Sequence, residues 1–314
     1  MKKYSKKRHI SARNIKNYDA IKIKRRIYRN LQDSWKENLL KLNSDNSLDE
    51  FFVSCTKDNR RIVKLLVENG KVDINAFDEY GDPAILLCAQ YSSYDAMRYL
   101  ISKGANPNCL SHRELSPLHI IAAKGNMKQL KYLIENGANP NIIGQFEETP
   151  IFEAVNKNYF KTTQLLIELG ADVNAQNEKG RTPLFTACQN DRRLESLVTL
   201  INFGADVNHE DINKMRPLSF AIKNNNLKGF EMLLKVNAEV NFADKFEVTP
   251  LMLACKIGNI EMVKALVKKG ADLTKLDSKG QTALDYAKKY NFKTCQEYLT
   301  KQTKLSLQNF EITN

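Results

Sequence analysis

Gly170-Ala171-Asp172-Val173-Asn174 and Thr182-Pro183-Leu184 decide the fold, because both signatures recur along the chain. Each glycine position is followed after 13 residues by a proline or, in the last unit, by Ala283. The prolines stand at positions 83, 117, 150, 183, 217 and 250, and the glycine positions are Gly104, Gly137, Gly170, Gly204, Asn237 and Gly270. Self-similarity at a period of 33 or 34 residues predicts a repeat architecture with one local structure per unit.

The recurring residues have mechanical roles in starting and ending helices. A Thr or Ser before proline can accept hydrogen bonds from free amides at a helix start, and proline suits the first helical turn. Glycine ends a helix in the left-handed conformation, and asparagine is the next best choice. Apolar residues between these signals have helical spacing, as in Met262, Val263, Leu266 and Val267. Each unit therefore predicts two short antiparallel helices and an extended turn, which must stack on neighbours to bury their apolar faces.

The period, Ser116-Pro117-Leu118-His119 and the Gly-Ala-Asp-Val-Asn signature resemble ankyrin repeats. The resemblance covers about residues 44–300, in seven recognisable units and a degenerate first one, Ser47–Asn75, that lacks the Thr-Pro start. It implies an all-α ankyrin-repeat solenoid of about eight stacked helix-turn-helix units with hairpin-like turns. We expect a basic N-terminal arm at 1–43, the array at 44–300 and a flexible C-terminal tail at 301–314.

Positive charge is concentrated in that arm. The 314 residues include 48 Lys and Arg against 36 Asp and Glu, but residues 1–42 alone hold 14 basic and three acidic residues. Residues 1–17 show no apolar periodicity, which predicts disorder. In residues 18–42 the apolar residues Ile23, Ile27, Leu31, Trp35, Leu39 and Leu42 recur every three or four positions, which predicts an amphipathic helix whose other face carries Lys24, Arg25, Arg26 and Arg29.

Two interpretations of this basic segment stay open. It could cover the exposed apolar edge of the first repeat. Alternatively, it could serve nuclear import, enter a calmodulin-like groove, or contact an acidic partner such as a tubulin tail, a nucleic acid or an anionic membrane.

The composition points to an intracellular protein. The start, Met1-Lys2-Lys3-Tyr4-Ser5-Lys6-Lys7-Arg8, has no apolar core after its charges, so we expect no classical signal peptide. The longest stretch without a charged residue, Pro83–Tyr94, has 12 residues, too few to span a membrane. We expect a cytoplasmic location, with a nuclear one left open.

Cysteine and histidine usage predicts no catalytic, cofactor or metal site. Cys55, Cys88, Cys188 and Cys255 share one slot on the first helix of their units and are expected to be reduced core thiols. His119 is expected to hydrogen bond at a helix start. The sequence contains no CxxC, HExxH, GxGxxG, P-loop or GxSxG motif. We expect no enzyme activity, no cofactor and no small-molecule substrate.

The resemblance implies protein binding along a concave face made of turn tips and first-helix side chains. The expected contact residues are Tyr80, Tyr91, Arg113, Leu115, Phe146, Lys179, Arg181, Met215 and Phe246. Tyr80, Phe146 and Phe246 share one register and are expected to anchor a partner, unless each folds back on its own hairpin. We expect a non-catalytic scaffold or adaptor. The alternatives are a nuclear or nucleic-acid-associated regulator and a microbial effector acting in a host cell.

Overall fold

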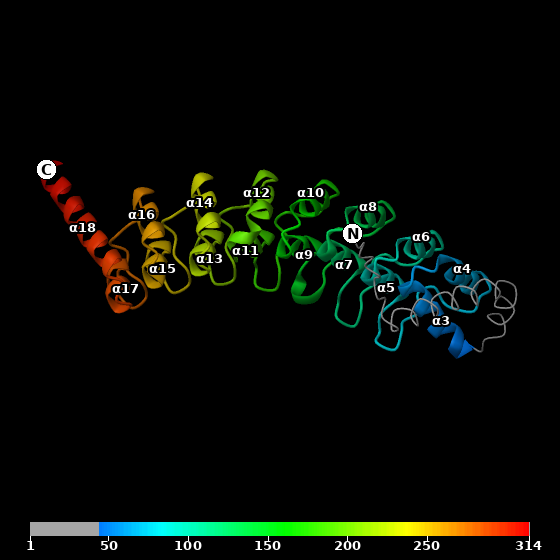
Figure 1. Cartoon of the computed structure of the whole chain (residues 1–314). Coiled ribbons are helices and arrows are strands. Elements are labelled where there is room, and N and C mark those ends of the chain that lie inside the picture. Colours follow the sequence, from blue (N-terminus) through cyan, green and yellow to red (C-terminus); the bar gives the residue numbers. More distant parts are fainter. Residues whose placement is uncertain (1–43, 314) are drawn as a thin grey trace, which may run out of the picture.

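Helix pairs packed side by side form an elongated array (Figure 1). The structure is a computed structural model that describes residues 44–313. The first helices of the units are α3 (Ser44–Thr56), α5 (Ala84–Tyr91), α7 (Pro117–Lys124), α9 (Pro150–Asn156), α11 (Pro183–Ala187), α13 (Pro217–Lys223), α15 (Pro250–Ile257) and α17 (Ala283–Lys289). The second helices are α4 (Arg60–Glu68), α6 (Tyr94–Ser102), α8 (Met127–Glu135), α10 (Phe160–Glu168), α12 (Leu194–Asn202), α14 (Leu227–Lys235), α16 (Ile260–Lys268) and α18 (Lys293–Thr313).

These pairs confirm the all-α solenoid expected from the sequence. Two short 3-10 segments, η1 (Gln145–Glu147) and η2 (Asp191–Arg193), complete the helical elements of residues 44–313. Each first helix packs on the first helices before and after it; α7, for example, contacts both α5 and α9. The expected arm at 1–43 lies outside the described residues.

Helix starts and ends follow the sequence signals, with two exceptions. The side chains of Ser116, Thr249 and Thr282 each accept a hydrogen bond from the backbone N–H three residues later. Thr149 and Thr182 precede their prolines without making such a bond. At the other end, the five signature glycines have φ between +84° and +96°, and Asn237 has φ of +59°. A left-handed residue therefore closes the second helix of each of these units, as the signature predicts.

The core runs through the whole array as one cluster. Its largest fully buried side chains include Phe51, Phe152, Phe185 and Phe230, which come from four different units. All six cysteines are free, and the four in the shared slot are buried as expected. Burial raises the pKa of Cys255 to about 12, so this thiol stays protonated and is a poor metal ligand or nucleophile.

Asparagine side chains tie each unit to the next. Asn141, the last residue of its signature, accepts a hydrogen bond from Asp172 N at 2.7 Å and donates one to Gly170 O at 2.9 Å. Asn108 and Asn241 make the same two contacts with the following unit. One amide side chain thus satisfies both a donor and an acceptor in the neighbouring turn, which explains why asparagine recurs there.

The C-terminal end differs from the expectation of a flexible tail at 301–314. The backbone of residues 301–313 continues α18 as helix, beyond the last helix pair (Figure 1). This helix is longer than its counterparts because no glycine follows it. Among residues 44–313, no helix is both long and apolar enough to cross a lipid bilayer.

Replacing Asn141 by Ala should lower the stability of the array by about 1–2 kcal/mol, because two hydrogen bonds between units are lost. Asn136→Ala is the matched control: its side chain bonds only Tyr132 O within its own helix, and its loss should cost less than about 0.5 kcal/mol. Urea unfolding followed by circular dichroism measures both midpoints. Equal midpoints for the two variants would contradict the role given to Asn141.

Candidate functional site

The loops between units end in rigid tips that project past the first helices (Figure 1). Every tip except the one at 144–148 is held by one side chain that accepts two backbone N–H groups. Asp211 Oδ1 accepts from Asn213 N at 2.8 Å and from Met215 N at 3.0 Å. The equivalent residues that hold the other tips in this way are Asp78, Ser111, Asn177, Asp244 and Asp277. The tip backbone is therefore fixed before any partner arrives.

This turn sorts tip residues into an outward position, two after the holding residue, and an inward position, four after it. Outward side chains face solvent: Tyr80 is 67 % exposed, and Phe146 and Phe246 are 56 % exposed. Arg113 and Lys179, also at outward positions, are exposed as well. Five of the expected contact residues thus share one geometric setting.

The inward position overturns part of the sequence expectation. Met215 is only 8 % exposed and belongs to the core, so it offers almost no surface to a partner. Leu115 and Arg181 are half-buried. The backbone N–H of each of these inward residues donates a hydrogen bond to the holding side chain. This bond turns the chain back toward the first helices.

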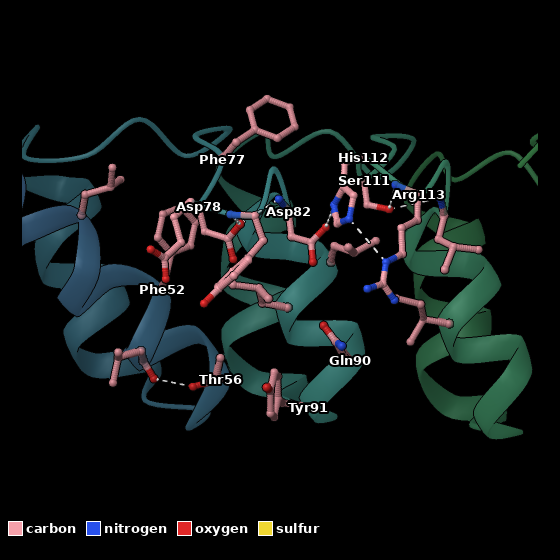
Figure 2. A pocket seen from close by; sticks show the side chains of 18 of the residues that line it. Phe52, Thr56, Phe77, Asp78, Asp82, Gln90, Tyr91, Ser111, His112 and Arg113 are labelled. Carbon is pink, nitrogen blue, oxygen red and sulfur yellow. Dashed lines mark hydrogen bonds and ion pairs between the residues drawn. The ribbon is translucent and has the colours of Figure 1, made fainter. Parts of the chain in front are cut away.

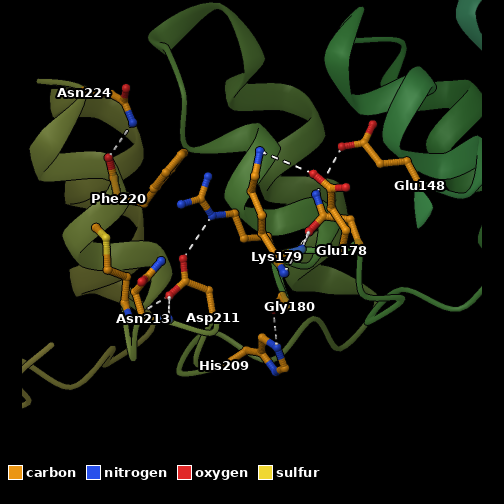
Figure 3. A network of polar contacts seen from close by, with 12 residues as sticks. Glu148, Glu178, Lys179, Gly180, His209, Asp211, Asn213, Phe220 and Asn224 are labelled. Carbon is orange, nitrogen blue, oxygen red and sulfur yellow. Dashed lines mark hydrogen bonds and ion pairs between the residues drawn. The ribbon is translucent and has the colours of Figure 1, made fainter. Parts of the chain in front are cut away.

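The Arg181 side chain contacts Asp211 and Phe220, both labelled in Figure 3. Its Nε donates to Asp211 Oδ2 at 3.0 Å, and its guanidinium lies 4.7 Å from the centre of the Phe220 ring. The Asp211 side chain is fully buried, and its other oxygen holds the next tip. Arg181 therefore links two neighbouring tips, in addition to any contact it makes with a partner.

Backbone hydrogen bonds also join successive tips. Glu178 N donates to Phe146 O at 3.0 Å, and Ser278 N donates to Phe246 O at 3.0 Å. Two further bonds of this kind, Ile212 N to Lys179 O and Lys245 N to Asn213 O, continue the series between them. Within the described residues, the tips at 78–82 and 111–115 are not joined by such a bond.

The tip that carries Phe146 is built differently, because Gly144 stands where other tips have the holding side chain. A Cβ at residue 144 would lie 2.7 Å from His119 Nε2, so glycine is needed where His119 is present. The imidazole accepts from Ser116 N through Nδ1 at 3.2 Å, and its Nε2 donates to Glu148 O at 2.9 Å. The expected role of His119 at a helix start is confirmed, and the same ring also supports this tip. Burial lowers the pKa of His119.

Tyr91, at the end of α5, lies in a groove of about 1010 Å³ near the start of the array (Figure 2). The first two tips and α3 provide the other walls, with Phe52, Phe77 and Tyr80 among the lining residues. The expected acidic-partner residues Lys24, Arg25, Arg26 and Arg29 lie outside the described part of the chain.

The described residues offer an exposed row of side chains for binding. Residues 44–313 contain no cluster of three His, Cys, Asp or Glu side chains placed to hold a metal ion. Their most regular surface feature is the row of outward side chains on backbones fixed by hydrogen bonds.

Comparison with protein families agrees with this geometry. The family model of ankyrin repeats matches residues 9–111, 101–177, 118–211, 152–244 and 218–309. The chain belongs to the ankyrin repeat family. Ankyrin repeats are protein-interaction modules, and the family is typically non-catalytic. The family match begins at residue 9, within the segment expected to be a separate arm. No curated protein matched the chain.

The sequence alone reveals no role for two sets of ankyrin residues. The asparagines between units and the holding residues at the tips both recur with the repeat period, for example Asp211, Asp244 and Asp277. This recurrence was the signal in the sequence that could have identified both sets. Spacing alone does not reveal their contacts, which reach a neighbouring turn or stabilise a reversal of the chain within one tip.

Arg181→Leu should destabilise the array by about 2–3 kcal/mol, since it leaves the buried Asp211 carboxylate without its cation, with allowance for the partial exposure of Arg181. Lys179→Leu, at the outward position of the same tip, is the matched control and should change stability by less than about 0.5 kcal/mol. Thermal unfolding compares the two. A larger loss for Lys179→Leu would refute the assignment of inward and outward positions.

The lowered pKa of His119 predicts a loss of stability in acid. Above the unfolded-state pKa of 6.5 the neutral ring is fully stabilising. As the pH falls from there through the folded-state pKa, the unfolded chain binds more protons than the folded one, and stability drops. We expect His119→Asn to flatten this dependence between pH 7 and 5, as measured by urea midpoints. Parallel pH profiles for both proteins would show that another group is responsible.

Proposed function

We propose that this ankyrin repeat protein is a non-catalytic adaptor that binds a protein partner through its outward tip residues. The observation that carries the proposal is the shared setting of Phe146 and Phe246: both rings are mostly exposed while their backbones are held in place. Aromatic side chains dominate binding hot spots, and a preformed loop loses little conformational entropy on binding. Lys179 offers a polar contact at a tip between these rings, and Arg113 offers one at the tip before Phe146.

The exposed fractions favour partner contact over the alternative in which each ring folds back on its own hairpin. Two large apolar side chains that stay exposed at one register contribute nothing to the stability of the array. Their apolar surface is removed from water only when a partner covers it.

Free, mostly buried thiols support an intracellular, reducing location for this adaptor. Regulation of a nucleic acid, and contact of residues 1–42 with a tubulin tail or an anionic membrane, rest on the charge of that segment alone. The exposed tip residues give no support to those alternatives. We therefore place the principal binding activity in the array.

The test is a double variant, Phe146→Ser with Phe246→Ser, expressed in the native cell as the full chain and compared by quantitative affinity capture. Loss of two hot-spot rings should reduce recovery of the principal partner by about tenfold or more. Phe160→Ser with Phe203→Ser is the matched control, because both are exposed phenylalanines away from the tips. It should leave recovery unchanged.

Circular dichroism must first show that both double variants keep the helix content of the parent protein. Unchanged recovery from the tip variant, or an equal loss from both variants, would rule out binding through the tips.

A further inference from the structure

The groove near the start of the array brings several exposed apolar side chains together. We call it the N-terminal groove; it is lined by α3, by α5, by the first two tips and by Ile120 of α7 (Figure 2). Its exposed apolar residues are Val53, Phe77, Tyr80 and Tyr91, with 40 %, 55 %, 67 % and 58 % of their surface accessible. Contiguous exposed apolar surface of this kind marks a binding site.

The groove forms at the first two tips, which are not joined by a backbone bond; among the described residues, the second and third tips lack such a bond as well. The first two tips meet through one side-chain contact, in which His112 Nδ1 lies 3.4 Å from Asp82 Oδ1. Within the second tip, Arg113 Nε lies 3.3 Å from His112 Nε2. The space between α3 and the second tip is open to an occupant.

The charge of the groove selects a basic occupant. Its lining includes four carboxylates, from Asp49, Asp78, Glu79 and Asp82, against one guanidinium, from Arg113. Asp49 and Glu79 are exposed, and neither makes an ion pair among the described residues. Opposite charge on a ligand would be favoured at this surface over like charge.

We propose that residues 18–42 of this same chain occupy the N-terminal groove. The segment carries apolar residues that match the apolar walls, and Lys24, Arg25, Arg26 and Arg29 match the four carboxylates. Its end, residue 42, lies two residues before the start of α3, and Leu48, Phe52 and Val53 of α3 form one wall of the groove. A tether this short gives an effective concentration in the millimolar range, so even weak docking is populated.

This contact goes beyond the proposed function and assigns different roles to the expected contact residues. Tyr80 and Tyr91 are covered by the protein itself, whereas Phe146 and Phe246 stay available to a partner. An external protein that binds the first tips must displace residues 18–42. The basic segment then acts as a competitor for the acidic end of the array.

Trp35 is the only tryptophan in the chain, so its fluorescence reports directly on this segment. In the full-length purified protein, we expect blue-shifted Trp35 emission and weaker quenching by acrylamide than in the urea-unfolded chain. Tyr80→Ser with Tyr91→Ser should weaken docking by about tenfold or more and move both signals toward the unfolded values. Phe146→Ser with Phe246→Ser, outside the groove, is the matched control and should leave Trp35 unchanged.

Charge reversal provides an independent test in the same full-length protein. Asp49→Lys with Glu79→Lys should expose Trp35, and adding Arg25→Glu with Arg26→Glu should restore its protection, because opposite charges again face each other. Circular dichroism checks that each variant keeps its helices, so a loss of folding is not read as a loss of docking.

Three results would overturn the proposal. Trp35 could be quenched as freely as in the unfolded chain, which leaves the groove to a separate protein. It could be protected equally in every variant, as expected if residues 9–43 stack on the outer edge of α3 and α4 as a further repeat. Finally, protection could vanish on dilution, which would identify the occupant as a second copy. None of these results bears on partner capture by Phe146 and Phe246, so the two proposals can fail separately.

Discussion

Stacking of one helix pair on the next is the interaction on which the rest of this structure depends. A first helix of seven or eight residues, such as α9 or α7, has too little surface to bury alone and is covered only when both neighbours are present. The asparagine contacts between units fix the register of this stacking at the turns. The stability of the array therefore comes from the sum of its nearest-neighbour interfaces. The tips lie at regular intervals because the interfaces repeat at regular intervals.

Regular stacking makes the tips a preorganised surface. The holding side chains and the backbone bonds between tips fix the loops, so a side chain at the outward position has nowhere to pack and remains in solvent. A side chain at the inward position packs against the protein instead, and Met215 and Arg181 contribute to the protein's own stability. Binding and stability thus use alternate residues of one loop, and a change at one position can leave the other intact.

The two ends of the array differ in what they offer. From Phe146 onward the tips are joined through their main chains, whereas the first two tips meet only through the His112 and Asp82 side chains and border an acidic, apolar groove. A basic segment tethered at that end complements the groove in both respects. Under the two proposals, the same loop design serves an external partner in the middle of the array and the chain itself near its start.

The repeat period and the residues that start and end helices determined the fold. Prolines at helix starts, glycines at helix ends and one cysteine slot all correspond to local conformational preferences. These preferences hold without knowledge of distant contacts. The same periodicity located the tips and the exposed rings of Tyr80, Phe146 and Phe246. Only the tertiary structure decided that Met215 is buried, that Arg181 pairs with Asp211 from the next unit, and that His119 requires Gly144. Each of these depends on atoms about one repeat away in the sequence, and such contacts leave no local pattern because the stacking of units alone brings the atoms together.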